Sequence, residues 1–407
     1  MHPSRTTLAW LTPAAFLMIA TATNQLSFAS WQTLINNFAV QSFGATGKEI
    51  GIQQSIREIP GLMAFTAVYL LFFMREQTLA IVSLAILGVG IAATGFFPTV
   101  MGFYLTTLVM SVGFHYYETM NQSLALQWFD RAEAPRVLGR ILSAAAIAQI
   151  VAFGLIFVFA RLLHVSFETM FLGFGMVGIA AAIVLGLAFP RFPQKVVQNR
   201  GIVLRKRYWL YYLINFMAGA RRQIFIVFAA FMMVETFGYR VDQIALLFLV
   251  NAVFNMVMAP RIGAFIIRFG ERRAILFENL ALLGVFLSYS VVTDPWIAAG
   301  LYVVDNAFFS LAIAHKTYFQ KIADPADIAP TAGVAFTINH IAAVFIPVLL
   351  GLVWVRNPSA VFLIGASFAA ISLLLSLLVP REPGHGNETT LSRQPPELPV
   401  DSAARAS

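Results

Sequence analysis

Ionisable side chains lie inside long apolar stretches of this sequence, and these are the residues able to do chemistry there. They are Arg57, Glu58, His115, Glu118, Arg221, Arg222, Asp305, His315, Lys316 and His340. An unpaired charge in hydrocarbon costs about 3 kcal/mol or more, so such side chains usually face a polar cavity or one another. Guanidinium groups suit carboxylate or phosphate, and a buried carboxyl group can change its charge near neutral pH. These residue types indicate a site for an anion, a proton or both.

The elements that must position these residues are strongly apolar. Of 407 residues, 59% are hydrophobic and only 11% are charged, which is more apolar surface than one soluble core can hide. The chain has no cysteine, which excludes disulfides, thiol nucleophiles, and zinc or iron–sulfur sites built on cysteine. We therefore predict an all-α integral membrane protein.

Apolar stretches of the length that crosses a bilayer, roughly twenty residues, recur along the chain and predict twelve spans. Their expected ranges are 9–38, 47–74, 77–97, 99–128, 138–163, 166–189, 208–236, 241–267, 273–292, 296–320, 330–354 and 358–380.

Lys and Arg are distributed unequally between the two sets of loops. If the amino terminus is cytoplasmic, the outer loops hold only Lys48, Arg161, Arg240 and Arg356, and the other basic loop residues lie inside. This positive-inside pattern predicts both termini in the cytoplasm of a bacterial inner membrane. Topology also explains the basic cluster at residues 205–207, so we expect membrane lipids as neighbours and no nucleic-acid partner.

The two halves of the sequence resemble each other at an offset near 194 residues. Ser42-Phe43-Gly44 corresponds to Thr236-Phe237-Gly238, and Ala134-Pro135 corresponds to Ala329-Pro330. We predict two pseudo-symmetric six-helix bundles at 1–189 and 208–380, a cytoplasmic linker at 190–207 and a disordered cytoplasmic tail at 381–407.

The loop that follows the eighth expected span carries a recognisable motif. Its sequence, Gly263-Ala-Phe-Ile-Ile-Arg-Phe-Gly-Glu-Arg-Arg273, resembles the G-x-x-x-D-R-x-G-R-R loop of the major facilitator superfamily. The fitting residues are Gly263, Arg268, Gly270, Arg272 and Arg273. Six plus six spans around a basic central loop is also the arrangement of that superfamily. The resemblance implies a gating role for this loop, through helix capping and pairing with acids such as Glu278.

In the superfamily, the first, fourth, seventh and tenth helices line a central cavity, and the intramembrane polar residues of this sequence concentrate on the corresponding spans. The resemblance therefore implies a substrate site and a set of proton-coupling acids. The predicted substrate-binding residues are Asn24, Gln25, Arg57, His115, Gln122, Arg221, Arg222, Asp305 and Asn306, and the predicted proton-coupling residues are Glu58, Glu118 and Asp305.

Structural interpretations compete with each of these roles. Neighbours in a helix point about 100° apart, so only one of Arg221 and Arg222 is expected to face the cavity, the other pairing with an acid such as Asp305. His115, Glu118 and Gln122 share one helical face, yet Glu118 is equally well explained as a partner of Arg57. The histidines suit hydrogen bonding, and because metal binding needs a convergence that sequence does not show, we predict no metal and no cofactor.

The most direct functional prediction is a secondary transporter that moves a small solute by alternating access. The surplus of buried cations favours an organic or inorganic anion, with protons as the coupling ion, and a proton-driven multidrug or metabolite exporter is the alternative. A membrane-embedded transferase lacks room in these short loops, no catalytic motif is present, and a non-transporting sensor lacks a signalling domain. We predict no enzymatic activity and a monomer.

Overall fold

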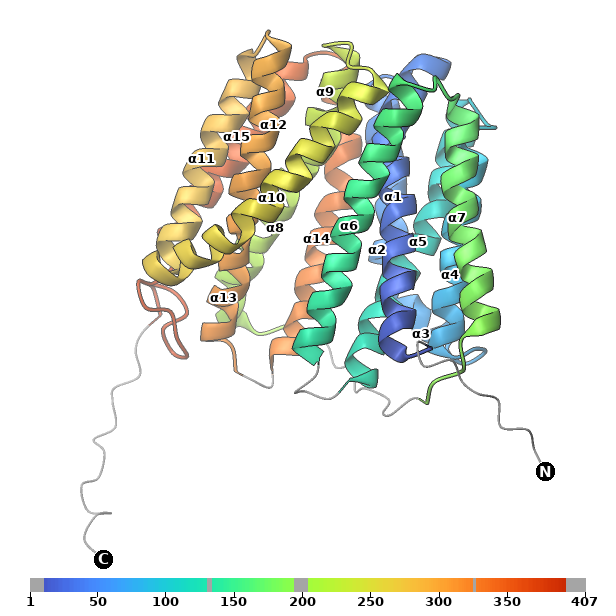
Figure 1. Ribbon diagram of the computed structural model, residues 1–407. Coiled ribbons are helices and arrows are strands. Elements are labelled where there is room, and N and C mark those ends of the chain that lie inside the picture. Colours follow the sequence, from blue (N-terminus) through green and yellow to red (C-terminus); the bar gives the residue numbers. More distant parts are fainter. Residues whose placement is uncertain (1–10, 130–133, 194–203, 325–326, 393–407) are drawn as a thin grey trace, which may run out of the picture.

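The computed structural model describes residues 11–129, 134–193, 204–324 and 327–392, and every regular element in these ranges is a helix (Figure 1). The first half contains α1 (Pro13–Phe43), α2 (Gly47–Leu62), η1 (Ala64–Thr66), α3 (Ala67–Leu70), α4 (Glu76–Thr94), α5 (Val100–Trp128), α6 (Ala134–Arg161) and α7 (Phe167–Ala188). The second half contains η2 (Lys206–Tyr208), α8 (Trp209–Gln223), η3 (Ile224–Ala229), α9 (Ala230–Glu235), α10 (Val241–Phe269), α11 (Glu271–Val291), α12 (Pro295–Phe309), η4 (Ser310–Ala312), α13 (Ile313–Ile322), α14 (Ile328–Trp354) and α15 (Pro358–Ser376).

The helices form an elongated bundle of long rods that lie side by side (Figure 1). Within the described ranges, nine helical segments are long and apolar enough to cross a membrane. The rods formed by α1, α2 and α5 fall outside this set, and all three bury polar side chains, among them Asn24, Gln53 and His115. The order of the rods agrees with the predicted spans, and the all-α membrane fold is confirmed.

Several rods are interrupted near mid-depth. The expected span 47–74 differs from the structure, because α2 ends at Leu62 and continues only as η1 and the short α3. Pro60 lies in the last turn of α2, where its ring lacks an N–H donor and crowds the preceding turn. A π-helical turn, η3, follows Gln223, and a 3₁₀ turn, η4, separates α12 from α13. Such irregular turns often mark functional positions.

The repeat seen in the sequence is also present in backbone geometry. Gly44 and Gly238 both have positive φ, +66° and +67°, a conformation that favours glycine. Two residues later each loop begins a helix with a similar cap: the Thr46 N–H donates to Glu49 Oε2 at 2.9 Å, and the Arg240 N–H donates to Gln243 Oε1 at 2.9 Å. The same local chemistry therefore starts the second helix of each half.

The two halves meet along two helix pairs, α2 against α14 and α6 against α10. The repeat relates α2 to α10 and α6 to α14, so it converts one pair into the other. This arrangement is expected for a parallel duplication about an axis along the bundle. We call the contact between the halves the seam.

The two ends of the bundle differ in how the halves touch. We call the end from which both chain termini emerge the terminal end and the opposite end the far end (Figure 1). At the far end, Asn37 Nδ2 donates to Tyr239 O at 2.7 Å, and Arg161 Nη1 lies 3.9 Å from Asp242 Oδ2. Figure 1 shows α10 leaning away from α6 toward the terminal end.

The first part of the tail differs from the predicted disorder. Residues 381–392 form turns against the terminal end of the second half, where Glu388 and Thr389 are buried. Tyr318 Oη donates to Glu388 O at 2.5 Å, and the Thr390 N–H donates to Leu378 O at 2.8 Å. These backbone groups find partners on helix ends, which composition alone does not reveal. The predicted tail from 393 onward lies outside the described residues, as do residues 194–203 of the predicted linker.

Candidate functional site

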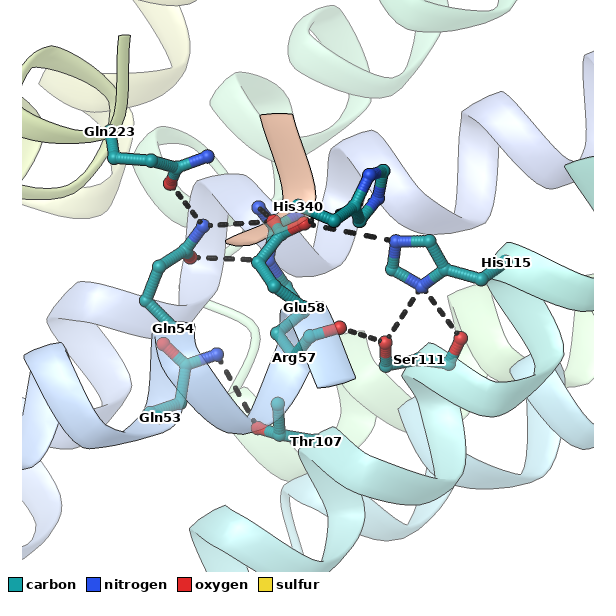
Figure 2. Close-up of polar contacts among 9 residues, drawn as sticks. All are labelled: Gln53, Gln54, Arg57, Glu58, Thr107, Ser111, His115, Gln223 and His340. Carbon is teal, nitrogen blue, oxygen red and sulfur yellow. Dashed lines mark hydrogen bonds and ion pairs between the residues drawn. The ribbon is translucent and has the colours of Figure 1, made fainter. Parts of the chain in front are cut away.

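A buried polar cluster lies at mid-depth on the seam, centred on Glu58 of α2 (Figure 2). Arg57 Nη2 lies 2.5 Å from Glu58 Oε1, and Gln54 Nε2 donates to the same oxygen at 3.2 Å. Gln54 Nε2 also donates to Gln223 Oε1, at 3.1 Å, in the second half. Because one helical turn of α2 supplies Gln54, Arg57 and Glu58, the i, i+3 and i, i+4 spacings bring these side chains together.

Two histidines approach the other oxygen of the same carboxylate. Glu58 Oε2 lies 3.9 Å from His115 Nε2 of α5 and 3.7 Å from His340 Nε2 of α14. The two imidazoles meet edge to face, with ring centroids 5.6 Å apart. Three helices from both halves therefore contribute to one buried cluster, as Figure 2 shows.

Ser111, one turn before His115, determines which nitrogen of the neutral imidazole carries the hydrogen. The Ser111 hydroxyl donates to the carbonyl of Arg57. His115 Nδ1 lies 3.0 Å from the Ser111 hydroxyl oxygen and 3.1 Å from the Ser111 carbonyl oxygen, and both of these act as acceptors here. Nδ1 must therefore carry a hydrogen, so in the neutral ring the lone pair of Nε2 is directed toward Glu58.

The adjacent arginines of α8 point in different directions, as helical geometry requires. Arg221 is buried inside the second half, and its Nη2 lies 3.4 Å from Glu278 Oε1 of α11. Arg222 instead is exposed, with its guanidinium 5.5 Å from the centre of the Phe309 ring and within electrostatic range of Glu58. Of the two predicted binding residues, only Arg222 is thus directed toward the region between the halves.

A second charged cluster fills the core of the second half. It contains Arg221, Glu278, Asp305 and His315, all nearly inaccessible to solvent. His315 Nε2 lies 3.1 Å from Glu278 Oε2. Arg221 interacts electrostatically with the carboxylates of Glu278 and Asp305. This arrangement agrees with the structural alternative for Arg221, with Glu278 as its direct partner. Glu278 also lies away from the gating loop, where Glu271 pairs with Lys321 at 2.8 Å instead.

Glu118 of α5 has surroundings unlike those of the other acids. Its Oε1 accepts a hydrogen bond from Asn24 Nδ2 at 3.0 Å, and among the described residues it forms no ion pair. The predicted stripe of His115, Glu118 and Gln122 is divided among different neighbours: His115 contacts Glu58, Glu118 contacts Asn24, and Gln122 is exposed. Arg57 is therefore the partner of Glu58 and not of Glu118.

Half-buried amides join corresponding helices in each half. Gln149 Nε2 of α6 donates to Gln25 Oε1 of α1 at 3.2 Å, and Asn339 Nδ2 of α14 donates to Asn215 Oδ1 of α8 at 3.2 Å. The repeat relates these two helix pairs. Asn306, a predicted binding residue, donates instead to Tyr302 O of its own helix at 3.1 Å.

The predicted gating loop lies at the terminal end between α10 and α11. Gly270 has φ +79° and separates the two helices, and the Arg268 guanidinium lies 5.3 Å from the centre of the Phe269 ring. Arg273 is exposed, and Arg272 and Gly263 are partly buried. The structure thus places Arg268, Gly270, Arg272 and Arg273 around one tight turn, whereas Gly263 lies earlier in α10, and their gating role stays a prediction.

Comparison with known proteins shows a family match for the second half of the chain and a fold match for nearly all of it. The model of the Major Facilitator Superfamily matches residues 211–403. The solved structure of the nucleoside transporter NupG, D323A mutant, aligns with a TM-score of 0.76 at 15% identity, covering 90% of this chain and 99% of that one. Residues 211–403 thus match the major facilitator superfamily, and the whole chain shares the fold of this solved transporter. No curated protein matches it.

Two other solved structures have a similar fold. A bacterial homologue of the human lysosomal transporter Spinster, in an inward-facing and unoccupied conformation, aligns with a TM-score of 0.73 at 13% identity, covering 97% of this chain and 100% of that one. An auto-inhibited peptide transporter of the POT family aligns with a TM-score of 0.68 at 12% identity, covering 90% and 95%. At these identities the superfamily fold is common to all, and the subfamily stays unassigned.

Six residues of the two clusters were missing from the predicted binding and proton-coupling residues: Gln54, Ser111, Gln223, Glu278, His315 and His340, of which the two histidines had been noted only as ionisable residues inside apolar stretches. Gln54 lies one turn before Arg57 and Glu58, and Ser111 lies one turn before His115, so helical spacing marked both. Glu278 lies two turns inside an apolar helix, and that depth was a sign of burial. No sequence signal pointed to Gln223.

Proposed function

We propose that this protein is a member of the major facilitator superfamily and a secondary transporter that moves a small organic or inorganic anion by alternating access. The observation that carries the proposal is Arg222, an exposed guanidinium near mid-depth that has no carboxylate within ion-pair distance among the described residues. Arg57 is neutralised by Glu58, so Arg222 leaves a net positive charge beside the seam. A planar guanidinium on an aromatic face is well suited to grip carboxylate or phosphate.

The position of Arg222 on α8 supports a role between the halves. Asn215, Gly219 and Arg222 lie at i, i+4 and i+7, which share one helical face. Asn215 bonds to Asn339 of α14, and a Cβ on Gly219 would lie 2.3 Å from Asn339 Oδ1. This face of α8 therefore packs on α14, the helix that forms the seam with α2, and Arg222 continues it.

Alternating access is supported by the unequal ends of the bundle. The described hydrogen bonds and ion pairs between the halves lie at the far end and at mid-depth, as in Asn37 with Tyr239 and Gln54 with Gln223. Two bundles joined in this way can rock about a central site. We propose that this conformation opens toward the terminal end, and that this end faces the cytoplasm of a bacterial inner membrane.

Glu118 is the proposed proton carrier. It is partly buried, accepts a hydrogen bond from Asn24 and lacks a cationic partner in the described part of the chain, so its charge is not fixed by an ion pair. A carboxyl group in such a position can gain or lose a proton at little structural cost. Asp305 and Glu58, the other predicted carriers, each interact with an arginine, Arg221 and Arg57 respectively.

Export of lipophilic cations is the second candidate, and the same Glu118 favours it. An unpaired carboxylate between α1 and α5 suits an amine as well as a proton. The two candidates differ in which charged residue binds solute, Arg222 or Glu118.

The test is a thermal-shift screen of the detergent-purified protein against organic acids, phosphates, nucleosides, short peptides, sugars and lipophilic cations. A ligand that binds only the folded protein raises its apparent stability. We expect stabilisation by one class of anion, weakened about 10- to 100-fold in affinity in Arg222→Gln, since a charge-assisted contact contributes about 1.5–3 kcal/mol.

Arg356→Gln is the matched control, because Arg356 is an exposed arginine at the far end, and it should bind like the wild type. Stabilisation by lipophilic cations that Glu118→Gln abolishes and Arg222→Gln leaves intact would replace the anion proposal with the exporter.

A further inference from the structure

The cluster of Glu58, His115 and His340 has the donor set of a metal centre. One carboxylate oxygen and two imidazole nitrogens, all on buried side chains, lie within 4.8 Å of one another. Two histidines and a carboxylate bind first-row divalent ions such as zinc, nickel or iron. The three side chains come from α2, α5 and α14, so the donors converge from both halves of the protein.

The distances are close to those that a bound ion requires. A tetrahedral zinc ion, with bonds of about 2.0–2.2 Å, holds its ligand atoms about 3.3–3.6 Å apart. Glu58 Oε2 lies 3.7 Å from His340 Nε2 and 3.9 Å from His115 Nε2. Shifts of a few tenths of an ångström therefore bring the carboxylate oxygen to ligand spacing from each imidazole nitrogen, and the donor atoms of the two histidines lie within 4.8 Å of each other.

The surrounding residues prepare the donor atoms for a metal. Because Ser111 fixes the hydrogen of His115 on Nδ1, the lone pair of Nε2 is directed at Glu58, where it faces another electron-rich atom. Arg57 and Gln54 both bind Glu58 Oε1, which leaves Oε2 directed at the imidazoles. Hydrogen bonds of this kind orient ligands in metal sites.

Gly61 makes room for the two imidazoles. A Cβ at this position would lie 2.3 Å from His340 Cδ2, 2.4 Å from His340 Nε2 and 2.7 Å from His115 Cδ2. Any larger residue would push both rings away from Glu58. The closest approach of α2 to α14 at this level is thus also the place where the donors meet.

We propose that Glu58, His115 and His340 form a binding site for a divalent transition-metal ion that bridges the two halves across the seam. Arg57 and Arg222 carry positive charge nearby, so binding is weaker than at structural zinc sites, and at least one coordination position stays open to a small ligand. An ion held by both halves opposes their movement, so zinc slows transport; this consequence rests on the proposed function, whereas binding itself does not.

The experiment measures equilibrium binding of Zn²⁺ to the full-length protein, purified in detergent without a polyhistidine tag, by competition with a chromophoric chelator. We expect about one ion per chain. His115→Ala, His340→Ala and Glu58→Gln should each weaken binding at least about tenfold. His164→Ala, which removes an exposed imidazole between α6 and α7, should bind zinc like the wild type.

Unchanged binding in all three cluster variants, or its loss in His164→Ala alone, would overturn the proposal. X-ray absorption of the zinc-loaded wild type tests the site without any substitution: two imidazoles in the coordination shell support it, and a shell of oxygen atoms alone contradicts it. Binding without an effect on transport would reject only the consequence for transport, and so distinguishes a failure of the metal site from a failure of the proposed function.

Discussion

The buried pair of Arg221 and Glu278 allows a quantitative test of the core of the second half. Their side chains are 2% and 0% exposed, and Nη2 of the arginine lies 3.4 Å from Oε1 of the glutamate. Removing one partner of a buried ion pair leaves an uncompensated charge and costs about 3–5 kcal/mol, whereas replacing both with apolar side chains is often neutral. We predict that Arg221→Met and Glu278→Leu are each severely destabilising.

The double variant distinguishes this explanation from a simple loss of packing. If the stranded charge dominates, the double variant should lose no more stability than either single variant, although each single variant costs about 3–5 kcal/mol. His315 and Asp305 stay in the cluster, so a residual loss is expected.

Chemical unfolding in detergent, followed by tryptophan fluorescence, measures the three free energies. Arg356→Met, at an exposed position, is the control and should change stability by less than about 0.5 kcal/mol. Additive losses within about 0.5 kcal/mol in the double variant, or single losses below about 1 kcal/mol, would refute the reasoning.

Three further predictions concern the repeat, the terminal end and proton coupling. Gly44→Ala should lower stability by about 1–2 kcal/mol, because φ at that position is +66°, and denaturant titration measures the change. The hydrogen bond from Arg205 holds the pKa of Asp327 at about 2, below its ordinary 3.8, so Asp327 stabilises the fold above pH 4 and loses that contribution as pH falls from about 4 to 2. The difference in melting temperature between wild type and Asp327→Asn should therefore vanish near pH 2, and a constant difference contradicts this assignment. Glu118→Gln should abolish uptake driven by a pH gradient and keep solute exchange, measured side by side in proteoliposomes; retained pH-driven uptake excludes Glu118 as the carrier.

Much of the architecture could be predicted from the sequence because membrane insertion imposes simple rules. The length of the apolar stretches predicted the membrane-crossing helices. The duplicated Ser-Phe-Gly and Thr-Phe-Gly segments predicted the repeat, since a helix end with positive φ needs glycine at the same place in both halves. The interruption of the second rod at Pro60 was also visible as a proline in an expected span. The folding of residues 381–392 was not, because it depends on partners on helix ends.

Several charged residues of the site were predictable from the sequence, but the side chains that they contact were not. Intramembrane charge singled out Arg57, Glu58, His115 and Arg222, because such groups are costly in hydrocarbon. Helical geometry predicted that Arg221 and Arg222 point in different directions. It could not predict which of the two arginines faces the seam, since that depends on how α8 packs on α14 and α11. The approach of His115 to His340 likewise depends on contact between the halves. Sequence spacing carries no information on it.

Transport itself is the most direct test of the central proposal, that a solute anion crosses the membrane by way of Arg222. The measurement is uptake, in proteoliposomes, of the anion that stabilises the purified protein, with wild type and Arg222→Gln compared at equal protein density. We predict saturable uptake by the wild type that Arg222→Gln reduces about 10- to 100-fold in apparent affinity for the anion. An anion that binds the protein but never enters the vesicles, or one whose uptake is the same in Arg222→Gln, would contradict the proposal.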